Sequence, residues 1–178
     1  MSDILQRVDR KFEDDHQIRL MLSHDALLKR EQLSTIGPLF DYWRECTTNR
    51  VPGKQIAFNP GSALSAEALR WVSWIDVRSD SALDFIWCNH VYGWLGDVST
   101  EYCDSSGRKV RDHNVKLHRQ YCAVEYQLCK SSKQPLYHEI KQHTGSIQRH
   151  YTRLLLPVLD EGGNVFRIFY ACRRFLPI

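Results

Sequence analysis

The chain has 178 residues and is 43% hydrophobic, which is enough for one core with an accessory segment but short for two ordinary domains. Its 24 Lys and Arg nearly balance 21 Asp and Glu, and the formal net charge of +3 is spread along the chain. Since contacts with phosphate need a concentrated basic surface, this balance argues against nucleic-acid binding, even though the many aromatic residues suit base stacking.

The cysteines and the N-terminus indicate the compartment. Six cysteines, at positions 46, 88, 103, 122, 129 and 172, form no CxxC pair and no closely spaced Cys/His set of the kind that holds zinc. We expect reduced thiols, with a disulfide framework as the alternative that an even count leaves open. Acidic residues interrupt Met1 to Gln17, where a signal peptide needs an apolar core, and no run is long enough to span a membrane. A soluble, cytoplasmic protein without membrane contact is expected.

The first third of the chain predicts helices. From Asp3 to about Gln32, apolar residues recur at helical spacing among good helix formers, and Ser23 can cap a restart. After Gly37-Pro38, the segment from Leu39 to Cys46 predicts a short helix, followed by a loop and one more short helix at 65–70. We therefore expect an N-terminal helical extension over residues 1–36, attached to a domain that spans residues 37–178.

The rest of the chain predicts two strands, a helix and three more strands. Aromatic and β-branched residues dominate 71–77 and 82–90, which a turn joins into a hairpin. In the segment 113–130, Leu117, Tyr121, Val124 and Leu128 recur as one face of a helix. The segments 136–143, 148–159 and 165–175 are extended, and Asp160-Glu-Gly-Gly-Asn164 indicates a hairpin turn. This order predicts an α+β fold with one antiparallel five-stranded sheet and helices on one face.

Both the order and particular residues resemble the PAS domain. Phe85-x-Trp87-x-Asn89, followed by Tyr92, Leu95-Gly96 and Gly107-Arg108, looks like the PAS pattern of a strand ending in Asn, a Leu-Gly helix and a Gly-basic turn. Leu154-Leu-Leu-Pro157-Val-Leu-Asp160 with Gly162-Gly163 resembles the last PAS strands. With the Tyr-Trp helix near the N-terminus, these features are similar to the proteobacterial PAS subfamily that often occurs as a whole, single-domain protein.

The resemblance implies a bacterial sensory or regulatory protein that acts in signal transduction by binding a small molecule, a signalling partner or both. The flavin-photosensor motif Asn-Cys-Arg-Phe-Leu-Gln is missing from the sequence, so the ligand stays unknown. The resemblance places the ligand between the central helices and the sheet. The ligand-binding residues that we expect are Phe85, Trp87, Asn89, Tyr92, Leu95, Leu117, Tyr121, Leu154, Leu156 and Tyr170.

Catalysis is not expected. Cys88 and His90 share one face of their predicted strand, but two side chains are too few for a zinc site, and Cys88 fits a small buried strand residue. Asn89 fits a strand end, where its side chain can bond the following turn. The sequence contains no nucleophile elbow, no Gly-rich phosphate loop and no oriented Cys/His set, so we expect no enzyme and no metal site.

The sequence leaves two alternative functions open and also suggests an oligomeric state. A histidine on the 113–130 helix, such as His118, could ligate haem, which would make the chain a haem-binding PAS sensor. A protein–protein interaction module with a closed core and no ligand is the second alternative. We also expect a homodimer, because the N-terminal segment carries more apolar residues than a solvated tail would; a monomer with this segment folded onto its own sheet is the alternative. These apolar residues are Val8, Phe12, Leu22, Leu28, Tyr42 and Trp43.

Overall fold

The computed structural model describes residues 3–12, 15–69, 71–88, 107–113, 116–144 and 147–175. The strands are β1 (Ile4–Phe12), β2 (Asp15–Leu22), β3 (Val72–Asp76), β4 (Ile86–Cys88), β5 (Leu136–Thr144), β6 (Ile147–Leu159) and β7 (Val165–Arg174). The α-helices are α1 (His24–Arg30), α2 (Ile36–Thr48), α3 (Ala66–Leu69) and α4 (Lys116–Ser132). Short 3-10 helices occupy Pro60–Ser62, Ala82–Asp84 and Val110–Asp112.

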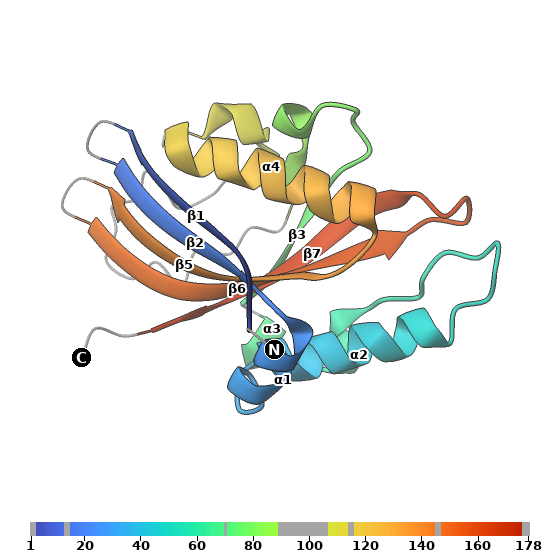
Figure 1. Ribbon diagram of the computed structural model, residues 1–178. Coiled ribbons are helices and arrows are strands. Elements are labelled where there is room, and N and C mark those ends of the chain that lie inside the picture. The colour runs from blue at the N-terminus through green and yellow to red at the C-terminus, as the bar shows by residue number, and fades with distance from the viewer. Residues whose placement is uncertain are drawn as a thin grey trace.

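The strands form one antiparallel sheet in the order β1-β2-β5-β6-β7-β3-β4. Helix α4 lies on one face of this twisted sheet, and α1, α2 and α3 lie on the other (Figure 1). The α+β class and the antiparallel sheet are therefore confirmed. Within the described residues the sheet has seven strands rather than five, and helices cover both of its faces rather than one.

The N-terminal helical extension is a wrong prediction over residues 4–22. Residues 4–12 and 15–22 form the paired strands β1 and β2, and β2 pairs with β5 from Asp15↔Thr144 to Leu22↔Tyr137. The apolar spacing fits a strand as well, because Ile18, Leu20 and Leu22 share one face. Pairing with β5 then outweighs the helix propensity of the segment, because propensity is a weak determinant that tertiary contacts override. Strands β1 and β2 thus belong to the same sheet as the strands of the predicted 37–178 domain.

Helices α1 and α2 follow β2 in the chain and lie on the sheet face opposite α4, where α2 packs on β6 and β7. The predicted cap is present, since Ser23 Oγ accepts a hydrogen bond from the Ala26 amide at 3.2 Å. Gly37 is required within α2, because a Cβ atom there would lie 2.4 Å from the Glu31 carbonyl oxygen. The Trp43 indole Nε1 donates to the Pro157 carbonyl oxygen at 2.8 Å and fixes α2 on β6. Leu22 and Trp43 are buried in this core, so they do not form the exposed apolar patch expected for a dimer.

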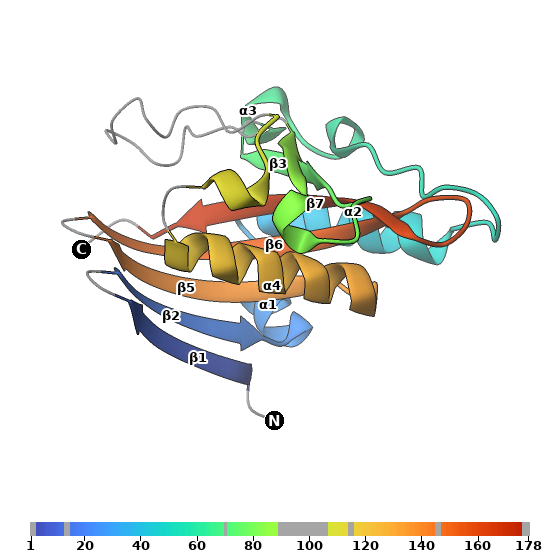
Figure 2. The ribbon, with the colours of Figure 1, turned by 90° about the horizontal axis from the view of Figure 1, so that it is seen from above.

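The core beneath α4 has two halves of different chemistry. Its apolar half lies over β3, β4 and β7 and contains Phe85, Trp87, Tyr126, Ile168 and Tyr170. Its other half lies over β2, β5 and β6, and there charged and polar side chains are buried. Figure 2 shows α4 lying over β5 and β6, with β1 and β2 continuing the sheet beyond the helix. Among the described helices, none has the length and apolar composition needed to cross a membrane.

Candidate functional site

The candidate site is a group of polar side chains, most of them buried, between α4 and the sheet, which we call the polar cluster. Its members come from β2, α4, β5 and β6. They are Gln17, Arg19, His118, Tyr121, Cys122, Glu125, His138 and Arg153. Three of the charged members have almost no solvent contact, with exposed fractions of 2% for Arg19, 6% for Glu125 and 3% for Arg153.

Strand register and helix periodicity bring these residues together. On the sheet, His138 of β5 lies directly opposite both Met21 of β2 and Arg153 of β6, so the three side chains share the face below α4. Gln17 and Arg19 belong to the same face as Met21 because strand side chains alternate. On α4, His118, Cys122 and Glu125 follow one another at intervals of four and three residues, so they lie on one side of the helix. The site therefore needs α4 and three strands.

Two buried guanidinium groups converge on one carboxylate. Arg19 Nη1 donates to Glu125 Oε2 at 2.6 Å, and Arg153 forms an ion pair with the same oxygen. Arg19 also donates from Nε and Nη2 to Gln17 Oε1, at 3.1 and 3.0 Å, and its guanidinium lies 4.4 Å from the centre of the Tyr121 ring. One negative charge thus faces two positive charges at a place that water does not screen.

The two histidines of the cluster are neutral. His118 Nε2 lies 3.3 Å from Cys122 Sγ, and His138 Nε2 lies 3.7 Å from Glu125 Oε1. Burial, reinforced by the positive charge of Arg19, lowers the pKa of His138 to about 3 and holds the pKa of His118 well below its usual range. These imidazoles consequently add no charge at neutral pH, and the excess of positive charge rests on the arginines.

Several buried polar atoms of the cluster lack a hydrogen-bond partner among the described residues. They are Gln17 Nε2, Tyr121 Oη, His118 Nδ1, His138 Nδ1 and Arg153 Nε. Buried polar groups are almost always paired, with protein, ordered water or ligand, because an unpaired group loses its hydration without compensation. Gln17 Nε2 and Arg153 Nε can only donate. The cluster therefore lacks acceptors more than it lacks donors.

Five of the ten ligand-binding residues expected from the sequence border the space beneath α4. Phe85, Trp87 and Tyr170 are buried in the apolar half, and the Trp87 indole donates to the Tyr126 hydroxyl at 3.3 Å. Leu117 and Tyr121 are buried on α4. Asn89, Tyr92 and Leu95 lie outside the described residues.

The placement of Leu154 and Leu156 with this group is wrong. Both leucines are buried in the core on the opposite face, against α2. Tyr170 pairs directly with Leu155 of β6, so Leu155 shares the α4 face and its two neighbours point away from it. The same alternation places Arg153 under α4. Of the polar cluster, Tyr121 was among the ten expected ligand-binding residues, and His118 was the candidate haem ligand.

Cys122 and Cys129 are buried in the core beneath α4. The five described cysteines are free, and burial raises the pKa of Cys172 to about 12. At neutral pH this side chain is a thiol and not a nucleophilic thiolate. Within the described ranges, no group of three or more His, Cys, Asp and Glu side chains is arranged to hold a metal ion.

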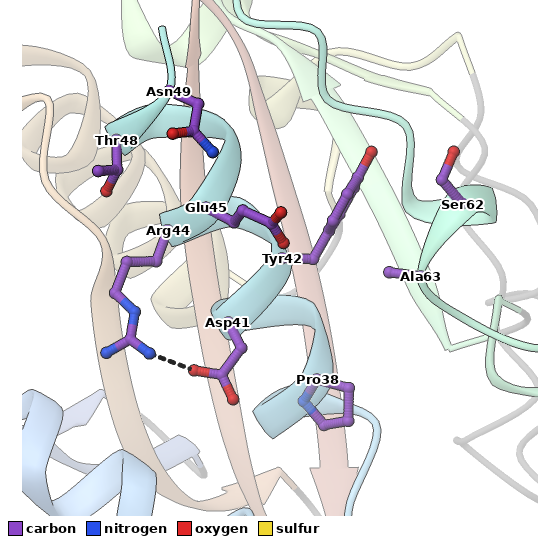
Figure 3. A pocket seen from close by; sticks show the side chains of 9 residues that line it. All are labelled: Pro38, Asp41, Tyr42, Arg44, Glu45, Thr48, Asn49, Ser62 and Ala63. Atoms are coloured by element: carbon purple, nitrogen blue, oxygen red, sulfur yellow. Dashed lines mark hydrogen bonds and ion pairs between the residues drawn. The ribbon is translucent and has the colours of Figure 1, made fainter.

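A groove on the opposite side of the molecule is the second place where a molecule could bind. It has a volume of about 770 Å³ and lies between α2 and the end of the 3-10 helix at Ser62 and Ala63 (Figure 3). It is lined by Pro38, Asp41, Tyr42, Arg44, Glu45, Thr48, Asn49, Ser62 and Ala63. The groove is open to solvent, and the ion pair between Arg44 Nη2 and Asp41 Oδ1, at 3.0 Å, is exposed. Water can satisfy such groups, whereas it cannot hydrate the polar cluster from bulk.

Comparison with known proteins returned no matching family model, no matching curated protein and no matching solved structure.

Proposed function

We propose that this chain is a PAS-type sensory or regulatory protein of the cytoplasm, which binds a small molecule between α4 and the sheet and passes its state to a signalling partner. The observation that carries the proposal is the polar cluster, whose buried atoms include donors without acceptors among the described residues. Since folding rarely leaves such groups unpaired, they need a partner from ordered water or a bound molecule, and we propose a bound molecule. No enzyme activity is proposed.

The arrangement around the cluster supports a PAS-like interpretation. The five strands from β3 to β7 are continuous within the sheet, and the early hairpin β3–β4 pairs with the last strand, β7. Helix α4 follows the early hairpin in the chain and lies on the sheet face that Phe85, Trp87 and Tyr170 share. These features agree with the residues that resemble the PAS pattern. The hairpin β1–β2 is an addition to that pattern.

The same contacts offer a route for the signal. Glu125 of α4 bonds Arg19 of β2 across 106 residues of chain, so the cluster links the central helix to the N-terminal hairpin. A ligand that binds Arg153 or Gln17 competes with or reinforces the Arg19–Glu125–Arg153 contacts. Binding thereby shifts the packing of α4 on β2, and the edge of the sheet reports the state of the site.

Native mass spectrometry of the purified protein tests this function. We expect a mass excess over the chain that disappears on denaturation and that is reduced in Arg153→Gln. A matched change on the other sheet face, Arg173→Gln, should leave the bound mass unaltered. An absorption spectrum of the same sample examines the haem-binding alternative, since a haem would absorb strongly in the visible. A bare chain mass, with no thermal stabilisation by any small molecule in a broad library, would favour the closed-core interaction module and refute the proposal.

A homodimer stays part of the proposal, but through a different surface. Strand β1 is at one end of the strand order, and its side chains are mostly exposed. If a second copy pairs antiparallel about Val8, Arg7 of each chain lies opposite Asp9 of the other, and Ile4 lies opposite Phe12. Opposite charges across a strand pair stabilise it, so this edge is self-complementary.

A further inference from the structure

We infer that the ligand of the polar cluster is a small oxyanion, with a carboxylate or an inorganic anion group bound by Arg153 and Gln17. This inference rests on the proposed function, because it requires that the cluster binds a ligand at all. It adds the chemical class of that ligand, which neither the fold nor the resemblance to PAS domains specifies.

The unpaired donors of the polar cluster favour a ligand that is rich in hydrogen-bond acceptors. Gln17 Oε1 already accepts two bonds from Arg19, whereas Gln17 Nε2 has no acceptor in the described part of the chain. Arg153 Nε is likewise buried without an acceptor, and the Tyr121 hydroxyl is a third group able to donate. A ligand that satisfies these atoms must supply acceptors, and an oxyanion supplies several lone pairs and no competing donor.

The excess of positive charge in the polar cluster also favours an anionic ligand. Arg19 and Arg153 face Glu125 alone among the buried carboxylates of this face, and the neutral imidazoles of His118 and His138 do not alter the balance. A buried charge is expensive unless a counter-charge accompanies it. An anion would compensate the second guanidinium, whereas a cation would increase the imbalance and a neutral apolar ligand would leave it unchanged.

The contacts of Arg153 show where the anion can bind. Its Nη1 donates to Cys122 Sγ at 3.5 Å, and its Nη2 pairs with Glu125, while Nε is unpaired within the described structure. A thiol sulfur is a weak acceptor, so replacing it with an oxygen of the ligand costs little. The guanidinium edge is a planar pair of donors that matches a carboxylate or a phosphate. Glu125 competes with the ligand for the same group.

The test compares anions with neutral molecules of the same shape. Acetate, succinate, phosphate and sulfate, each at millimolar concentration, are added to the full chain and its melting temperature and binding heat are measured. Acetamide and succinamide serve as the neutral probes. We expect at least one anion to raise the melting temperature by several degrees, as ligands that bind the native state do, and neither amide to do so.

Two variants and a matched control make the test specific. Gln17→Glu keeps the oxygen that Arg19 needs but replaces the unpaired donor with an anionic oxygen, so it should fold and lose the response to anions. Glu125→Gln removes the competing carboxylate and should strengthen anion binding about tenfold or more, the scale of one charge-assisted hydrogen bond. Gln148→Glu introduces the same charge at an exposed position of β6 and should respond like the wild type.

The outcomes distinguish the oxyanion inference from the proposal that the polar cluster binds a ligand. Stabilisation by the amides as large as that by the anions, or a full anion response in Gln17→Glu, would overturn the oxyanion inference but leave ligand binding intact. A copurifying molecule identified by mass spectrometry as neutral or cationic would overturn it as well. If no anion binds and the native mass is that of the bare chain, the inference and the proposed function fail together.

Discussion

The carboxylate of Glu31 holds the connection between α1 and α2 on the sheet, and removing it should destabilise the whole fold. Glu31 is fully buried. Its Oε1 accepts hydrogen bonds from the Tyr137 hydroxyl at 2.6 Å and from Thr152 Oγ1 at 2.7 Å. Its Oε2 accepts from Ser34 Oγ at 2.6 Å and from Arg173 Nη1 at 2.9 Å. Four donors from four parts of the chain thus depend on one side chain.

The cost of Glu31→Ala follows from the groups that it leaves behind. Tyr137 and Thr152 are buried, so each hydroxyl would lose its acceptor at a cost of about 1–3 kcal/mol. The Arg173 bond adds little, because that side chain is 37% exposed and water can replace the carboxylate. We expect a total loss of about 4 kcal/mol, which for a chain of this size lowers the melting temperature by roughly 8–16 °C.

Chemical denaturation and calorimetry of two variants would check this account. Tyr137→Phe removes a single donor and leaves the carboxylate with three, so it should cost only about 1 kcal/mol. A double-mutant cycle between Glu31 and Tyr137 should show a coupling of the same order. A loss below about 1 kcal/mol for Glu31→Ala would mean that water or a rearranged loop replaces the carboxylate, and the reasoning would be refuted.

Three further outcomes are expected. The pKa of His138 is lowered from 6.5 to about 3 in the folded protein, so the unfolded chain takes up this proton first as the pH falls. The contribution of neutral His138 to stability is therefore fully present above about pH 6.5 and is lost progressively toward pH 3. At pH 5 the free energy of unfolding should be about 2 kcal/mol lower than at neutral pH for this reason. Denaturation at pH 5 and pH 7 measures it, and His138→Gln should have a shallower pH dependence than the wild type; an unchanged slope would contradict the assignment. Trp43→Phe removes the indole bond to the Pro157 carbonyl and should cost about 1–3 kcal/mol in unfolding free energy, with α2 still helical by circular dichroism; a neutral effect would show that this bond does not fix α2. Asp9→Arg should convert a β1-paired dimer to a monomer by placing like charges opposite each other, as measured by light scattering, whereas Asp41→Arg on exposed α2 should not; a wild-type monomer at tens of micromolar would refute the dimer.

The sequence alone predicted those elements whose pattern allows only one periodicity. The span from Leu117 to Leu128 fits a helix, and α4 forms there. The β6–β7 hairpin follows from its turn, in which Gly163 has a φ of 78° and the Asp160 side chain accepts from the Asn164 amide at 2.8 Å. The Ser23 cap also followed from sequence, because capping is a contact between near neighbours. Such local chemistry does not depend on the rest of the fold.

Only the tertiary structure decided the N-terminal hairpin and the polar cluster. The spacing of Ile18, Leu22 and their neighbours suits a helix face and a strand face alike, and pairing with β5 at a distance of more than 100 residues selects the strand. The faces of β6 depended on its register with β7, which turned Leu154 and Leu156 toward α2 and Arg153 toward α4. A charge such as Glu125 is expected at a helix surface until packing buries it beside Arg19. Long-range strand pairing fixes which side chains share a face of the sheet, and the packing of α4 on that face brings the residues of the candidate site together.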